Sequence, residues 1–159
     1  MKLYTFICKN KTNIWAGIGA GLWAVSDADP SIMKARRTRS YNIRPGNIGL
    51  IYCSDESSKS LTTPFIFVSA PDPEETEKDV WPEEWKMPFR IHPLGTPRKE
   101  WNAHEAAKAL PFNTASQNTN VTSVFKAVGT AVFTPIEIGD EDWAMILDRL
   151  ADKTSAGSK

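Results

Sequence analysis

The sequence predicts an α+β domain, built as a small curved or closed β-barrel with flanking helices. Two observations lead to this prediction. Short β-rich runs recur at irregular intervals, and helical segments with recognisable caps lie between them and at the end. The length of 159 residues suits one domain with a substantial core. We expect that domain at residues 1–152 and a flexible tail at residues 153–159.

Apolar, β-branched runs bounded by turn residues indicate the strands. Four such runs are expected to lie in one sheet: 3–8, 48–53, 64–70 and 87–94. The segment 14–25 also contains Ile, Trp, Leu and Val, but its three glycines would each cost a helix interior about 1 kcal/mol. We therefore expect an irregular or bulged strand at 14–25. A further strand is expected at the end of the β-branched segment 121–133.

Capping residues and amphipathic spacing indicate the helices. Asp29 followed by Pro30 is typical of a helix start, with a carboxylate cap and a proline in the first turn. We expect this helix to run to about Arg39. A short helix is expected at 102–110, and the apolar periodicity of 140–152 predicts a terminal amphipathic helix.

Charge is unevenly distributed along a chain whose net charge is zero. Net neutrality argues against a protein that grips long duplex DNA by phosphate neutralisation alone. Between residues 31 and 46, however, only basic charges occur, which is the pattern of a phosphate-binding face. Four cations here are expected to contact a nucleic-acid backbone: Lys34, Arg36, Arg37 and Arg39. The long loop 71–85 is acidic, and a solvated surface is its simplest interpretation.

Three of the six tryptophans lie at segment edges beside polar or turn residues: Trp15, Trp81 and Trp85. An indole offers a large flat surface that stacks on a base or a cation, and its N–H still needs a polar partner. Edge tryptophans are therefore what a pocket for a flipped base requires. The alternative is that each one plugs the end of a small core. Trp23 is a fourth candidate, but its apolar neighbours favour a core position.

The two cysteines, Cys8 and Cys53, both lie in strand-like apolar runs. Buried thiols of this kind are the rule in a reducing cytoplasm, where we expect the protein to reside. Neither cysteine has ligand spacing to the other or to the two histidines, His92 and His104. We therefore expect no metal and no cofactor, and no run of residues predicts a membrane partner.

Several short motifs resemble two related families of nucleic-acid-binding domains. A YTH domain is resembled by Lys9-Asn10, Asn13-Ile14-Trp15, Val80-Trp81, Trp85 and Phe89-Arg90. An EVE domain is resembled by the turn and strand at 44–54, by Met87-Pro88-Phe89-Arg90-Ile91, and by 133–136 with the helix that follows. Both families share the PUA-like fold, a compact β-barrel with flanking helices. The resemblance implies this fold for the chain to about Leu150.

The resemblance also implies a function, the reading of modified bases in nucleic acid. YTH domains hold N6-methyladenine in an aromatic cage, and EVE-like domains include readers of modified cytosine in DNA, often attached to nucleases. By position, Trp15, Trp81 and Trp85 match the cage and Asn10 falls near a base-edge contact. Ala16 departs from the Ser or Cys common in YTH domains. The resemblance thus implies a non-enzymatic reader of methylated adenine or modified cytosine, with DNA favoured over RNA and a nuclease as a potential partner in trans.

Two other classes of protein stay open. The first is a metal-dependent nuclease, in which Asp72, Glu84 and Lys86 would surround a divalent cation. The second is an interaction module that captures a peptide or a methyl-lysine on its aromatic side chains, for which the acidic loop would suit a cationic ligand. The basic stretch at 34–44 favours phosphate over a cationic tail, and so favours the nucleic-acid reader.

Overall fold

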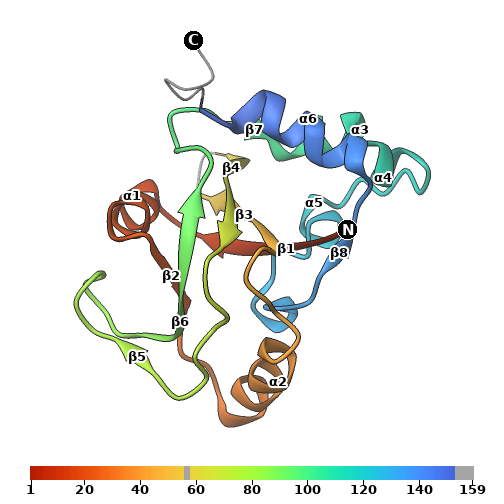
Figure 1. Ribbon diagram of the computed structural model, residues 1–159. Helices are drawn as coiled ribbons and strands as arrows, with labels where there is room; N and C mark the ends of the chain where they lie inside the picture. Colours follow the sequence, from red (N-terminus) through yellow and green to blue (C-terminus); the bar gives the residue numbers. More distant parts are fainter. Residues whose placement is uncertain (56–57, 153–159) are drawn as a thin grey trace.

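A computed structural model describes residues 1–55 and 58–152, and it shows a mixed α+β architecture around one sheet (Figure 1). The strands follow the spatial order β2-β6-β4-β3-β1-β8, with β5 paired to β6 and β7 paired to β4. The strands span β1 Lys2–Cys8, β2 Leu22–Val25, β3 Ile48–Ser54, β4 Lys59–Phe67, β5 Thr76–Glu77, β6 Trp85–Pro93, β7 Trp101–Asn102 and β8 Ile136–Glu137. Among the described strands the sheet is open, so the α+β class is confirmed and the closed PUA-like barrel is not.

Helices cover both faces of this sheet (Figure 1). They span α1 Lys11–Ala20, α2 Pro30–Ser40, α3 Ala103–Ala109, α4 Pro111–Thr114, α5 Val121–Val124 and α6 Asp140–Leu150, with a 3₁₀ turn, η1, at Gly129–Ala131. The expected helix starts are confirmed, since the side chains of Asp29 and Asn102 accept hydrogen bonds from the first turns of α2 and α3. None of the helices in the described ranges is long and apolar enough to cross a membrane.

Strand alternation divides the core into two clusters. Tyr4 and Phe6 of β1 face a cluster that also contains Trp23, Trp81 and Trp85, against α1 and β2. Leu3 of β1 and Leu50 of β3 point to the other side of the sheet and belong to a second cluster formed with α3, α5 and α6. The first face therefore holds most of the aromatic side chains.

The expected strand at 14–25 is wrong in its first half, because residues 11–20 form helix α1. Its start is set by Asn10, whose side chain accepts a hydrogen bond from the Asn13 N–H at 2.8 Å. Its end is set by Gly21, which is left-handed at φ 65°. Gly17 is required by packing, since a Cβ there would lie 2.7 Å from the Trp23 ring. The caps and the tertiary contacts of α1 thus outweigh the low helix propensity of its glycines.

Two further expectations need correction. The strand expected at the end of 121–133 is absent from that described segment, which folds as α5 and η1 instead. The strand expected at 64–70 runs from Lys59 to Phe67, because its threonine-rich start pairs with β3 and extends the ladder beyond Pro64. The expected tail at 153–159 lies outside the described residues.

Candidate nucleic-acid interface

A cavity of about 350 Å³ opens on the aromatic face where β1 ends and α1 begins. This volume lies in the range of small-ligand sites. Its lining comes from Phe6 to Asn10 without a break, Asn13, Trp23 to Ser26, Arg36, Glu83, Trp85, Gly129 and Val132. The cavity therefore joins an aromatic wall to amide and charged side chains.

Three tryptophans pack against one another beside this cavity. The rings of Trp81 and Trp85 are stacked, with centroids 4.2 Å apart and planes 12° from parallel. Trp23 stands nearly perpendicular to both, at 5.6 Å from Trp81 and 5.4 Å from Trp85. Trp23 and Trp85 line the cavity, whereas Trp81 supports Trp85 from outside the lining set. Trp23 is thus both a core residue, as its apolar neighbours predict, and part of the cavity wall.

The stacked pair leaves no room for a base between its two rings. A base sandwiched by two indoles needs a contact distance of about 3.5 Å on each side, so about 7 Å between the indoles. The observed 4.2 Å is far less. A base could therefore enter between these two indoles only if the pair moved apart.

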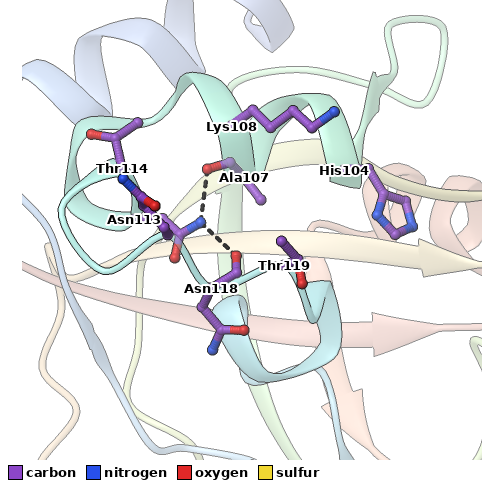
Figure 2. Close-up of a pocket in the computed structure, with 8 residues that line it drawn as sticks. His104, Ala107, Lys108, Asn113, Thr114, Asn118 and Thr119 are labelled. Atoms are coloured by element: carbon purple, nitrogen blue, oxygen red, sulfur yellow. Dashed lines mark hydrogen bonds between the residues drawn. The ribbon is translucent and has the colours of Figure 1, made fainter.

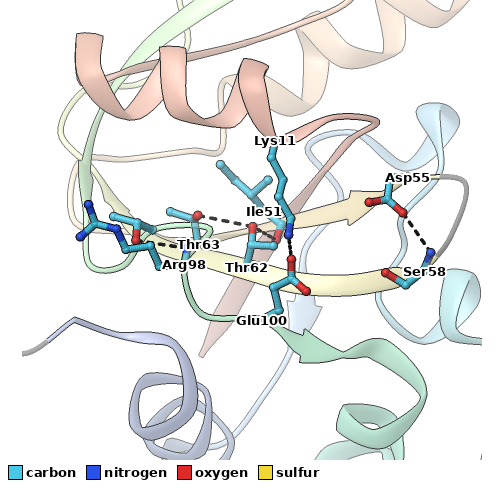
Figure 3. A network of polar contacts seen from close by, with 9 residues as sticks. Lys11, Ile51, Asp55, Ser58, Thr62, Thr63, Arg98 and Glu100 are labelled. Atoms are coloured by element: carbon cyan, nitrogen blue, oxygen red, sulfur yellow. Dashed lines mark hydrogen bonds and ion pairs between the residues drawn. The ribbon is translucent and has the colours of Figure 1, made fainter.

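Trp15 occupies a different place from the other expected cage residues. It lies on α1 with 39% of its surface exposed, and the Arg98 guanidinium lies over its ring, 5.6 Å from the centroid. The same side of α1 is anchored by an ion pair between Lys11 and Glu100 (Figure 3). The structure therefore brings Trp81 and Trp85 together but leaves Trp15 outside the cavity lining. Because residues 11–20 form a helix and not the expected strand, Trp15 lies away from the position expected for it.

The first turn of α1 supplies amide groups to the cavity. Asn10 lines it as expected, although its Oδ1 is occupied as the helix cap. Asn13 also lines it, and its main-chain carbonyl accepts a hydrogen bond from Trp81 Nε1 at 2.9 Å. Within the described ranges the side-chain amide of Asn13 has no hydrogen-bond partner. Sequence patterns did not single out Asn13, although it belongs to the Asn-Ile-Trp motif that suggested the family.

Ala24 and Glu83 complete the wall next to the indoles. Ala24 lies in a β-bulge, between the register pairs Trp23–Phe89 and Val25–Lys86. Glu83 is exposed at the rim, where its Oε1 accepts a hydrogen bond from Trp85 Nε1 at 3.0 Å. The carboxylate thus holds the Trp85 ring in place at the mouth of the cavity.

Two of the four cations expected to hold a phosphate backbone donate hydrogen bonds to main-chain carbonyl groups. Arg36 is only 3% exposed, and it donates to Ser26 O at 2.7 Å and to Gly129 O at 3.0 Å. Arg39 donates to Thr130 O at 3.0 Å and to Val132 O at 2.7 Å. Burial, and then the charge of Arg39, lowers the pKa of the Arg36 guanidinium. Both arginines tie α2 to the 129–132 segment and so hold the far wall of the cavity.

The other two cations remain at the surface of α2. Lys34 and Arg37 are both exposed, and Arg37 forms a surface ion pair with Glu74 at 3.4 Å. Exposed pairs of this kind contribute little to stability and exchange readily for another partner. These two side chains, like Lys9 at the cavity, are exposed cations.

Cys8 forms part of the cavity floor as an unreactive thiol. Its Sγ–H donates to Asn10 O at 3.2 Å. Burial raises the pKa of Cys8 to about 11, and the Glu83 carboxylate adds a smaller increase. Cys53, its register partner across the parallel β1–β3 pair, is also buried with a raised pKa caused first by burial.

The metal-dependent nuclease receives no support. Among the described residues, no group of three or more His, Cys, Asp or Glu side chains could hold a metal ion. Lys86, the proposed third member, donates from Nζ to Thr76 Oγ1 at 3.2 Å. Asp72 lies in the loop before β5, where its side chain accepts from the Glu74 N–H.

A second cavity, of about 310 Å³, lies on the opposite side of the sheet between α3 and the loop after α4 (Figure 2). His104 and Lys108 of α3 form one side of it. The buried Asn113 holds the loop by donating to Ala107 O at 2.8 Å and to Asn118 O at 2.9 Å. Both hydrogens of the Asn113 amide are therefore used to hold the loop after α4 against α3.

Comparison with known proteins addresses the fold. A scan against protein-family models gives no match, and no curated protein matches the sequence. Solved structures do match. The Pho92 YTH domain in complex with m6A superposes with a TM-score of 0.59 at 11% identity, over 97% of this chain and 85% of that one.

The chain has the fold of a YTH domain. Two further structures agree, each covering 96% of this chain and 89% of its own with a TM-score of 0.57. One is the Toxoplasma CPSF4-YTH domain in apo form, at 16% identity. The other is the YTH domain of the Zygosaccharomyces rouxii MRB1 protein in complex with N6-methyladenosine RNA, at 10% identity. The expected resemblance to YTH domains is thereby confirmed at the level of the fold. Sequence identities of 10–16% support a shared fold and nothing further.

Proposed function

We propose that this chain is a non-catalytic reader that binds one methylated base of a nucleic acid in the cavity beside Trp23 and Trp85. The observation that carries the proposal is the composition of that cavity, whose lining combines two indoles with the side chains of Asn10 and Asn13. Aromatic faces attract any base, whereas amides form hydrogen bonds with its edge. Two structures of the same fold hold N6-methyladenosine or RNA that carries it, which makes methyladenine the first candidate.

The energies suit such a role. Stacking of a base on aromatic side chains contributes about 1–3 kcal/mol, and burying one methyl group adds about 0.8 kcal/mol. Extracting a base from a duplex costs a few kcal/mol, whereas a base in a single strand is already accessible. A cavity lined by two indoles therefore favours a single-stranded ligand, for which this cost does not arise.

RNA is the proposed nucleic acid. The preference for DNA came from the resemblance to EVE domains, and none of the three structures named above is described with DNA. Sequence-specific recognition of RNA mostly uses unpaired bases, which agrees with a cavity sized for one base. Lys9, Lys34 and Arg37 would contact the phosphates, so affinity would fall as salt rises. No feature of the described residues calls for a nuclease partner.

The test is a binding titration of short single-stranded RNAs, followed by fluorescence anisotropy. The set contains one oligonucleotide with a central N6-methyladenine, its unmodified counterpart, and a DNA of the same sequence and modification. We expect the methylated RNA to bind about fourfold more tightly than the unmodified RNA, the value of one buried methyl group. Equal affinities for the methylated and unmodified RNAs would contradict the proposal.

A further inference from the structure

Glu83 is the one side chain in the cavity lining that carries a negative charge. It belongs to the loop between β5 and β6, and its Oε1 accepts a hydrogen bond from Trp85 Nε1 at 3.0 Å. In the described part of the chain its other oxygen, Oε2, has no hydrogen-bond partner. The carboxylate is therefore fixed by one oxygen beside the aromatic wall and free to accept with the other.

A carboxylate in this position is unfavourable for phosphate binding, because like charges repel. It is favourable for the edge of a base that donates. The exocyclic amino groups of adenine and cytosine donate a hydrogen bond, and N6-methyladenine keeps one such N–H. Uracil and thymine carry a keto oxygen in place of the cytosine amino group, which a carboxylate repels. Carboxylate side chains are known partners of the cytosine amino group.

We propose that Glu83 selects adenine and cytosine, through their exocyclic amino groups, over uracil and thymine, a specificity role that rests on the proposed function of the cavity. Base stacking on Trp23 and Trp85 is indifferent to this distinction, since every base has an aromatic face. The side-chain amide of Asn13 can donate as well as accept, and so tolerates both kinds of edge. Among the charged side chains of this lining, the Glu83 carboxylate is the one that accepts a hydrogen bond and cannot donate one.

Two methylated pyrimidines test the inference directly. 5-Methylcytosine and 5-methyluracil have nearly the same shape and differ at position 4, where one has an amino group and the other a keto oxygen. Each is placed at the centre of the same RNA, beside a third RNA with N6-methyladenine and an unmodified one. Affinities are measured for the wild type, for Glu83→Gln, and for Glu84→Gln as a matched control, since Glu84 is an exposed neighbour outside the cavity lining.

We expect the wild type to prefer 5-methylcytosine over 5-methyluracil by about tenfold, the size of one good edge contact. Glu83→Gln should reduce this ratio to about twofold, because an amide can donate to the keto oxygen as well as accept from the amino group. Its side-chain oxygen can still accept from Trp85 Nε1, so the indole keeps its position. Glu84→Gln should leave the ratio unchanged.

An unchanged ratio in Glu83→Gln would overturn the role of Glu83 and leave the reader function intact. An equal loss of affinity for both pyrimidines would also overturn it, because Glu83 would then only position Trp85. If the wild type binds none of the methylated RNAs more tightly than the unmodified one, the proposed function fails, and the inference fails with it.

Discussion

The indole of Trp81 lies parallel to that of Trp85 at 4.2 Å, so that one face of Trp85 is already covered. The two N–H groups point to different partners, the Asn13 carbonyl for Trp81 and the Glu83 carboxylate for Trp85. Trp81 thereby connects the acidic loop to the first turn of α1. This pair fixes the aromatic wall before any ligand arrives, and it assigns different roles to two residues that the sequence presents as equivalent.

Trp85 should matter for binding and Trp15 should not. Replacing Trp85 by Phe reduces the stacking surface and removes the N–H that bonds Glu83, and we expect methylated RNA to bind about fivefold more weakly. Trp15→Phe is the matched control, since Trp15 lies outside the cavity lining and contacts Arg98. Anisotropy titrations of both variants decide between the two positions. A larger loss for Trp15→Phe would restore the cage expected from the sequence.

Replacing the buried Trp81 should lower the free energy of unfolding far more than replacing the exposed Trp15. Trp81 is 3% exposed and Trp15 is 39% exposed. Trp81→Ala should therefore lower the free energy of unfolding by about 3–5 kcal/mol, as for other large-to-small changes in a core. Trp15→Ala should lower it by less than about 1 kcal/mol. Urea denaturation followed by circular dichroism measures both, and similar losses would mean that the two indoles are equally buried in solution.

Replacing two glycines of α1 by alanine should change the free energy of unfolding in opposite directions. A Cβ on Gly17 would lie 2.7 Å from Trp23 Cε3 and 2.8 Å from the Leu22 carbonyl oxygen, so Gly17→Ala should cost about 1–3 kcal/mol of unfolding free energy. Gly19 has no atom within 4 Å of that position, so Gly19→Ala should stabilise the helix by up to about 1 kcal/mol. Thermal or urea unfolding of the two variants is the measurement. A gain in stability for Gly17→Ala would show that α1 does not pack on Trp23.

Cys8 should make the stability fall at alkaline pH. Its pKa of about 11 in the folded protein lies above the ordinary thiol value of 9.0, so the folded state holds the thiol proton more tightly than the unfolded state. The contribution is fully present below pH 9 and is lost as pH rises from 9 to 11. Comparing wild type with Cys8→Ala isolates it, because the difference between their unfolding free energies should shrink across that window. A constant difference would contradict the raised pKa.

Helix caps and apolar runs in the sequence were enough to predict several elements of the fold. The cap at Asp29 and the apolar runs that became β1, β3 and β6 needed no tertiary information. Helix α1 was missed because three glycines argue against a helix when they are weighed by propensity alone. One of them is a C-cap and another fits against Trp23, and both facts depend on the folded structure.

The candidate site was predicted only in part for a related reason. A tryptophan in an apolar run was expected to be core and edge tryptophans were expected to form the pocket, yet Trp23 is core and cavity wall together. Once residues 11–20 are helical, Asn13 turns toward the cavity while Trp15 does not. The burial of Arg36 could not be read from its basic neighbours either, since its partners lie ten and 93 residues away.

The salt dependence of binding should distinguish Lys34 and Arg37 of α2 from Arg39 of the same helix. Lys34 and Arg37 are exposed, so their replacement by Ala should weaken RNA binding for all sequences and reduce the slope of log K against log salt by about 1 for each lost phosphate contact. Arg39→Ala should instead lower the free energy of unfolding and leave that slope unchanged, because its guanidinium is bound to the carbonyls of Thr130 and Val132. Titrations at several salt concentrations, with unfolding curves for the same variants, give both quantities. A reduced slope for Arg39→Ala with unchanged stability would show that this arginine leaves the 129–132 segment to bind phosphate.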